Sequence, residues 1–151
     1  MKWTYQFDVE ASVADIYRTV TPLSWMTFYM PRFYQGVEYV APGWPAAGSY
    51  IVLRYGVGPV HVQMRQTITA HEVGQRLRIR EDILNGFWTD TNEISLQVAG
   101  NTTKVTVVSD QRSPHWPLAW VGPLRWLTNW LDLPPALRRF KQMIEREALP
   151  T

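Results

Sequence analysis

The sequence predicts a single α+β domain, in which a meander of antiparallel strands precedes a C-terminal helix. The chain has 151 residues, of which 46% are apolar, so it is long enough for one domain with a core and too short for two. Apolar and polar residues alternate over residues 3–9, which indicates a half-buried first strand. Turn signals then recur from residue 37 onward, and the chain ends on an apolar stripe at helical spacing.

Two short helices are expected after the first strand. Ser12 stands three residues before Asp15, a variant of the capping box, and apolar residues at helical spacing follow. Thr21 and Pro22 form a second helix start, because Pro is well placed at the first helical position. Pro31 should end this second helix.

The middle of the chain is expected to form six strands joined by tight turns, and Pro134-Pro135 is expected to begin the last helix. The apolar stripe of that helix consists of Leu137, Phe140, Ile144 and Ala148. The turn signals are residues 41–48, Gly56-Val57-Gly58, Val73-Gly74, Asn85-Gly86 and Gly100-Asn101.

This order of elements resembles the helix-grip fold of the SRPBCC superfamily. That superfamily includes the birch pollen allergen family, the START lipid-transfer domains and the polyketide cyclase/dehydrase-like branch, which the chain is judged to resemble most. The resemblance spans nearly the whole chain and is carried by VEASVADIY at 9–17, LSW at 23–25, Gly48 and LRRFKQMIE at 137–145. It implies a curved antiparallel seven-stranded sheet wrapped on a long C-terminal helix around an apolar cavity, which carries lipids or cyclises polyketide-like substrates.

The hairpin turns predict which residues face each other across the sheet, because the pairing next to a short turn propagates along both strands. Three turns agree on one inner face, and Arg78, Arg80 and Glu93 fall on the opposite face, where we expect them to be exposed. The predicted inner-face pairs are Leu77/Ile94, Ile79/Asn92, Glu81/Asp90, Ala70/Leu77, Ile68/Ile79, Gln66/Glu81, Met64/Ile83, Leu96/Val105, Ile94/Val107, Asn92/Ser109 and Asp90/Gln111.

The predicted inner face combines an apolar floor with a polar row. Unpaired buried polar groups cost about 1–3 kcal/mol each, so such a row needs an explanation. A closed hydrogen-bond network, a sheet end that opens into water, and a cavity with one polar end all fit the pattern. The floor is Ile68, Ala70, Leu77, Ile79, Ile94, Leu96, Val98, Val105 and Val107, and the row is Gln66, Glu81, Asp90 and Gln111, with Asn92 and Ser109 beside it.

Glu81 and Asp90 are the candidate catalytic residues. Their register predicts Cα atoms roughly 4.5 Å apart, where two ionised carboxylates repel each other. One carboxyl can retain a proton, a cation can lie between them, or both can face water. A shared proton would supply a general acid and a general base for cyclisation or dehydration of a ketone. A structural or ligand-anchoring role is the alternative.

The sequence therefore predicts a domain that binds a small hydrophobic molecule, such as a lipid, a quinone or a polyketide-like compound. A cyclase or dehydratase that uses Glu81 and Asp90 is one alternative, and a surface interaction or chaperone module is another. The residues expected to contact the ligand are Gln66, Ile79, Trp88, Asn92, Ile94, Ser109, Gln111 and Trp120.

Several other site classes are not expected. The chain has no Cys, and His61, His71 and His115 show no metal-ligand spacing, so we expect no metal site and no cofactor. His61 and His71 are assigned to the outer face. A net charge of +2 gives no reason to expect a DNA partner. The N-terminus shows no hydrophobic signal region, and we expect a cytoplasmic protein whose oligomeric state the sequence leaves open.

Four of the eight Trp residues lie between residues 116 and 130. This stretch is too interrupted for a membrane span. Its aromatic side chains fit the core under the sheet, a lid hinged at Gly122-Pro123, or an interfacial patch in transient contact with a membrane.

Overall fold

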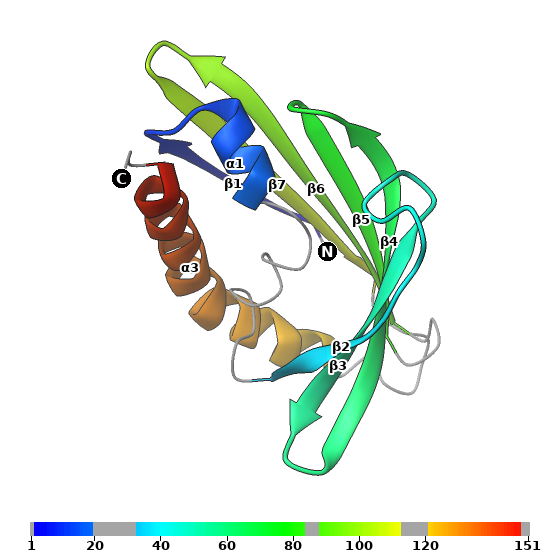
Figure 1. Cartoon of the computed structure of the whole chain (residues 1–151). Coiled ribbons are helices and arrows are strands. Elements are labelled where there is room, and N and C mark those ends of the chain that lie inside the picture. The colour runs from blue at the N-terminus through cyan, green and yellow to red at the C-terminus, as the bar shows by residue number, and fades with distance from the viewer. Residues whose placement is uncertain (1, 20–32, 84–87, 113–120, 149–151) are drawn as a thin grey trace.

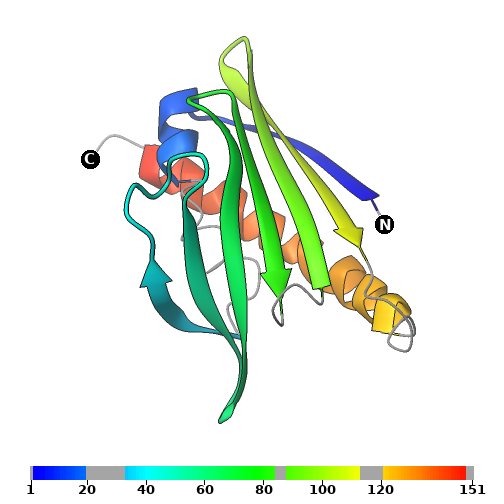
Figure 2. The ribbon, with the colours of Figure 1, turned by 90° about the vertical axis from the view of Figure 1, so that its right-hand side faces the viewer.

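The computed structural model describes residues 2–19, 33–83, 88–112 and 121–148 of the chain. Seven antiparallel strands form one sheet in the order β1-β7-β6-β5-β4-β3-β2. The sheet curves around the long helix α3, which crosses its concave side (Figures 1 and 2). The elements are β1 (Lys2–Val9), α1 (Val13–Thr19), β2 (Tyr34–Val40), β3 (Tyr50–Val57), β4 (Val60–Glu72), β5 (Arg76–Ile83), β6 (Trp88–Ala99), β7 (Thr102–Arg112) and α3 (Val121–Ala148).

Helix α1 begins where the capping pattern predicts. Ser12 Oγ accepts a hydrogen bond from the backbone N–H of Asp15 at 3.2 Å and donates one to Asp15 Oδ2 at 2.5 Å. These bonds satisfy a helix donor that would otherwise lack a partner. The helix buries Ile16 completely against the sheet. The second short helix, predicted between Thr21 and Pro31, lies outside the described residues.

The last helix is longer than predicted. Pro134 and Pro135 lie inside α3 instead of starting it, because the helix already begins at Val121. Each Pro removes one backbone hydrogen bond. Both Pro residues are exposed, so water can solvate the freed carbonyls, and α3 bends along its length (Figure 1). The predicted stripe is confirmed at Phe140 and Ile144, which are fully buried.

The predicted strand registers are confirmed around two of the three turns. Across β5 and β6 the sheet pairs Leu77 with Ile94, Ile79 with Asn92 and Glu81 with Asp90 as expected. Across β6 and β7 it pairs Asp90 with Gln111, Asn92 with Ser109, Ile94 with Val107 and Leu96 with Val105. The inner face assigned from the sequence is therefore the face that lies toward α3.

The third register is right only in part. Gln66 pairs with Glu81 and Ile68 with Ile79 as predicted, but a bulge between Ile68 and Ala70 shifts the pairing by one residue. Ala70 consequently pairs with Arg78, and the predicted Ala70/Leu77 pair is wrong. The turn uses three residues, 73–75, with Gly74 at a φ of +72°, where two were predicted.

The same bulge moves His71 to the position opposite Leu77, so its assignment to the solvated outer face is wrong. His61 is exposed as predicted. Val98, expected on the apolar floor, is 69% exposed because it lies beside the tip of the β6–β7 hairpin. Arg78 and Arg80 are exposed as predicted, while Glu93 is half-buried against Arg78.

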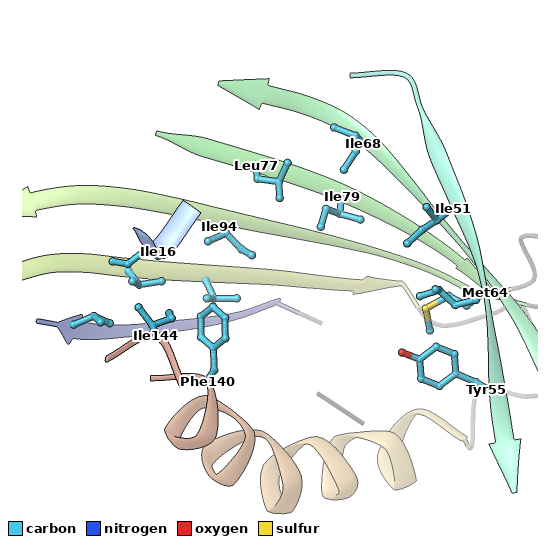
Figure 3. Packing of buried hydrophobic residues seen from close by; sticks show 14 residues of the cluster. Ile16, Ile51, Tyr55, Met64, Ile68, Leu77, Ile79, Ile94, Phe140 and Ile144 are labelled. Carbon is cyan, nitrogen blue, oxygen red and sulfur yellow. The ribbon is translucent and has the colours of Figure 1, made fainter. Parts of the chain in front are cut away.

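The core gathers most densely where α1 and the C-terminal half of α3 meet the sheet. There Ile16, Ile144 and Phe140 face Ile94 (Figure 3). The Phe140 ring packs edge-on against Phe7, with ring centroids 6.2 Å apart and planes at 84°. At the other end of the sheet Tyr55 and its buried neighbours extend the same inner face.

Candidate ligand site on the inner face of the sheet

Four polar side chains form a line across the inner face. Gln66, Glu81, Asp90 and Gln111 come from four neighbouring strands and are register partners in that order. They are 0%, 3%, 1% and 6% exposed, respectively. We refer to these four residues as the polar row. The alternative of a sheet end that opens into water is therefore excluded, because all four are buried.

Hydrogen bonds between described side chains help to order the polar row. Gln66 Nε2 donates to Glu81 Oε1 at 2.8 Å, and the indole Nε1–H of Trp88 donates to Asp90 Oδ1 at 2.8 Å. Both carboxyl groups thus accept bonds from buried donors. Gln66 Oε1 is buried and accepts no hydrogen bond, so the network in the polar row is not closed at this atom.

The polar row is bordered by apolar side chains on both sides. Toward the β5–β6 turn lie Leu53, Met64 and Trp88. On the other side lie Ile68 and Ile79, and beyond them Leu77, Ile94 and Val107. The face therefore presents a polar band between two apolar surfaces, which is the pattern of a small-molecule site.

Asn92 and Ser109, predicted to lie beside the polar row, pair with each other on the same face and are only half-buried. Two half-buried polar side chains on a face that α3 crosses indicate that this part of the face is not fully packed.

On β1, burial raises the pKa of the Tyr5 hydroxyl above its ordinary value.

The inner face of β4 to β7 carries carboxylates but no Arg or Lys side chain. Every Arg and Lys of these strands occupies a position that alternates with the inner-face residues. Glu81 and Asp90 are direct register partners, so their charges lie close together in a buried setting. Two ionised carboxylates in this arrangement would repel each other unless a retained proton or a cation balanced them.

Sequence reasoning missed the contribution of β3. Ile51, Leu53 and Tyr55 alternate with Val52 and Arg54 along β3 and are buried, and Ile51 pairs directly with Gln66. Residues 50–55 signal a strand by their β-branched and aromatic residues, but Val52 hides the alternation that would have shown which side chains face inward. The His71 ring stacks on Tyr17 of α1, with centroids 5.5 Å apart, and the bulge that moves it there had no signal in the sequence.

A hollow of about 620 Å³ lies on the outer face of the sheet. The Arg65 guanidinium lies 3.9 Å from the centroid of the Tyr50 ring in this hollow. Nearby, hydrogen bonds from Arg54 above all, and from Gln63, lower the pKa of Glu38. The hollow is lined by Tyr39, Tyr50, Val52, Gln63, Arg65, Arg80 and Asp82.

The structure describes only part of the Trp-rich stretch. Trp120 lies outside the described residues, as does Trp116, so the role of the Trp-rich stretch stays a prediction. Within the described ranges, no group of three or more His, Asp or Glu side chains is arranged to hold a metal ion. No described helix is long and apolar enough to cross a membrane.

Solved structures with the same architecture cover nearly the whole chain. A major latex-like protein of Panax ginseng matches with a TM-score of 0.63 and 16% identity over 99% of this chain and 98% of that one. Ara h 8.0201 matches with a TM-score of 0.70 and 8% identity over 95% and 97%. The chain has the helix-grip fold.

A bacterial protein of known structure also shares this fold. A protein from Chromobacterium violaceum matches with a TM-score of 0.66 and 13% identity over 95% of this chain and 96% of that one. No protein-family model matches the sequence. No curated protein matches it either. The resemblance to the SRPBCC superfamily is therefore confirmed at the level of the fold.

Proposed function

We propose that this protein binds a small hydrophobic molecule with one polar group between the inner face of the sheet and α3. The observation that carries the proposal is the buried polar row between two apolar surfaces. Apolar surface supplies affinity and a few placed polar groups fix orientation. Helix-grip proteins typically bind hydrophobic ligands in a cavity, which supports the same assignment.

Titration with N-phenyl-1-naphthylamine tests the proposal, because this uncharged dye becomes fluorescent in apolar surroundings. We expect saturable binding of one dye per chain. Asn92→Phe should abolish binding, since it places a ring beside the polar row. Thr91→Phe is the matched control, because Thr91 precedes Asn92 on β6 and faces outward. Equal binding by both variants, or no saturable binding by the wild type, would refute the assignment.

A catalytic role is the second candidate, and the burial of Glu81 and Asp90 as direct register partners favours it. A carboxylate of the pair would remove a proton from the carbon next to a ketone, and the partner carboxyl would protonate the oxygen of the enolate. This chemistry suits the cyclase or dehydratase activity that the polyketide cyclase-like resemblance implies.

Deuterium exchange into 1-phenylbutane-1,3-dione separates catalysis from binding alone. An acid–base pair should accelerate exchange of the protons between the carbonyl groups. Glu81→Gln and Asp90→Asn should each reduce that acceleration by roughly 100-fold or more while the diketone still binds. Exchange that matches the buffer rate in wild type would leave a binding protein without acid–base catalysis.

A further inference from the structure

The hollow on the outer face of the sheet contains an Arg side chain, Arg65, that forms no ion pair with any residue the structure describes. Its register partner is Asp82, but Asp82 Oδ1 accepts hydrogen bonds from Arg80 Nε at 3.0 Å and from Thr89 Oγ1 at 2.9 Å. The other Arg side chains of β3 to β5 each pair with a carboxylate: Arg54 with Glu38, Arg76 with Glu72, Arg78 with Glu93 and Arg80 with Asp82.

The charges that line the hollow do not cancel. Two Arg and one Asp are among its described lining residues, so one positive charge is left over. The nearby Glu38 does not neutralise this charge, because its two carboxyl oxygens accept hydrogen bonds from Arg54 and Gln63, both at 2.7 Å. The hollow therefore favours a ligand with a single negative charge.

A tyrosine ring holds the Arg65 guanidinium in place. The guanidinium carbon lies 3.9 Å from the centroid of the Tyr50 ring. This contact restricts the side chain without using its N–H groups in a hydrogen bond to any described residue. An Arg that is already positioned loses less conformational freedom when it binds an acceptor, so the ring prepares the guanidinium for an anion.

The rest of the hollow offers aromatic and apolar surface beside this cation. Tyr39 pairs with Val52 across β2 and β3, and Val52 pairs with Arg65 across β3 and β4, so the three side chains follow one another across the sheet. Tyr39 is 46% exposed, and its ring centroid lies 5.5 Å from that of Tyr50. The volume of about 620 Å³ is that of a small-molecule site.

We propose that the hollow on the outer face binds a small planar aromatic carboxylate. The Arg65 guanidinium binds the carboxylate, for which two parallel hydrogen bonds are the favoured geometry, and the aromatic ring of the ligand packs on Tyr39 and Val52. A phosphate monoester fits less well, because it carries about 1.5 to 2 negative charges at neutral pH against one unbalanced positive charge. The site lies on the opposite face of the sheet from the polar row and does not rest on the function proposed above.

Calorimetry with 2-naphthoate and its uncharged analogue 2-naphthamide tests the proposal at pH 7 and low salt. We expect saturable binding of one 2-naphthoate per chain, with an affinity about 5-fold higher than that of 2-naphthamide, since the ion pair forms at a partly exposed site. Equal affinities for the two compounds, or no saturable binding of 2-naphthoate, would overturn the proposal.

The variant Arg65→Gln should remove the preference for 2-naphthoate over 2-naphthamide. Arg78→Gln is the matched control, because Arg78 is also exposed on the outer face but lies outside the hollow and faces Glu93 at 3.8 Å. It should retain the wild-type preference. Urea denaturation midpoints report whether the variants fold. A preference that survives in folded Arg65→Gln would overturn the role of Arg65.

The position of bound 2-naphthoate separates this proposal from the one for the inner face. Nuclear Overhauser effects should join its ring protons to the methyl groups of Val52, and it should not displace N-phenyl-1-naphthylamine. Contacts to the methyl groups of Ile79 and Ile94 instead would overturn this proposal and leave the inner-face site standing. Binding of 2-naphthoate at Val52 by a protein that does not bind the dye would overturn the inner-face proposal alone.

Discussion

At the scale of single residues, the central feature is a pair of acidic side chains on a buried face. Glu81 and Asp90 are 3% and 1% exposed and directly opposed. Their proximity was predictable, because the Asn85-Gly86 turn sets the register that brings them together. The bond from Trp88 Nε1 to Asp90 was not predictable, because it depends on the rotamer of a side chain two residues away.

Asp90→Asn should leave the free energy of unfolding near neutral pH unchanged or raise it by about 1–2 kcal/mol. If the pair retains a proton in the native state, that state binds more protons than the unfolded state above the ordinary carboxyl range. Wild type should then lose stability as pH rises through that window, and Asp90→Asn should lose less.

Denaturant midpoints between about pH 4 and 8 measure this difference. Asp8→Asn, which removes an exposed carboxylate from β1, is the control and should follow the wild-type profile. If Asp90→Asn also follows that profile, the two carboxyl groups do not share a proton, and the acid–base role should be abandoned.

At the scale of elements, short-range patterns predicted the strands and the start of α1 well. Hairpin turns and alternation act over a few residues, and the registers of β5, β6 and β7 follow from them. The bulge after Ile68 and the early start of α3 were missed, since both depend on contacts made by the rest of the molecule. A Pro-Pro pair is read from the sequence as the start of a helix, and nothing in the local sequence shows that Pro134-Pro135 lies inside one.

The cap of α1 should contribute about 1 kcal/mol to folding. Ser12→Ala removes the bond that the Asp15 N–H makes to Ser12 Oγ, so the free energy of unfolding should fall by about that amount. Ser12→Thr keeps an oxygen at the same place and should restore most of it. Equal stability of the Ala variant and wild type in urea denaturation would show that the cap does not stabilise the helix.

Packing of α3 on the sheet should depend strongly on Phe140, which is fully buried against Phe7. Phe140→Ala should lower the free energy of unfolding by about 3–5 kcal/mol, because it removes a ring and leaves a cavity. Arg139→Ala, at the exposed neighbouring position, should change it by less than about 0.5 kcal/mol. Similar midpoints for the two variants in denaturant would mean that this contact does not hold α3 in place.

At the scale of the whole molecule, the curved sheet and α3 place one polar band between apolar surfaces and leave the Arg and Lys residues of β4 to β7 on the outer face. The fold could be predicted from the sequence because the three hairpins with assigned registers agreed on the same inner face. The ligand could not be predicted in the same way. Strand register places a side chain on one face of the sheet, but it does not determine which polar atoms of that side chain remain without a hydrogen-bond partner. Gln66 Oε1 became visible only in the structure.

The central claim is that ligand binds on the inner face, and nuclear Overhauser effects from bound N-phenyl-1-naphthylamine to side-chain methyl groups test it most directly. We predict contacts from the dye to the methyl groups of Ile79 and Ile94, which border the polar row on the inner face. Contacts confined to Val52, which lines the hollow on the outer face, would contradict the claim.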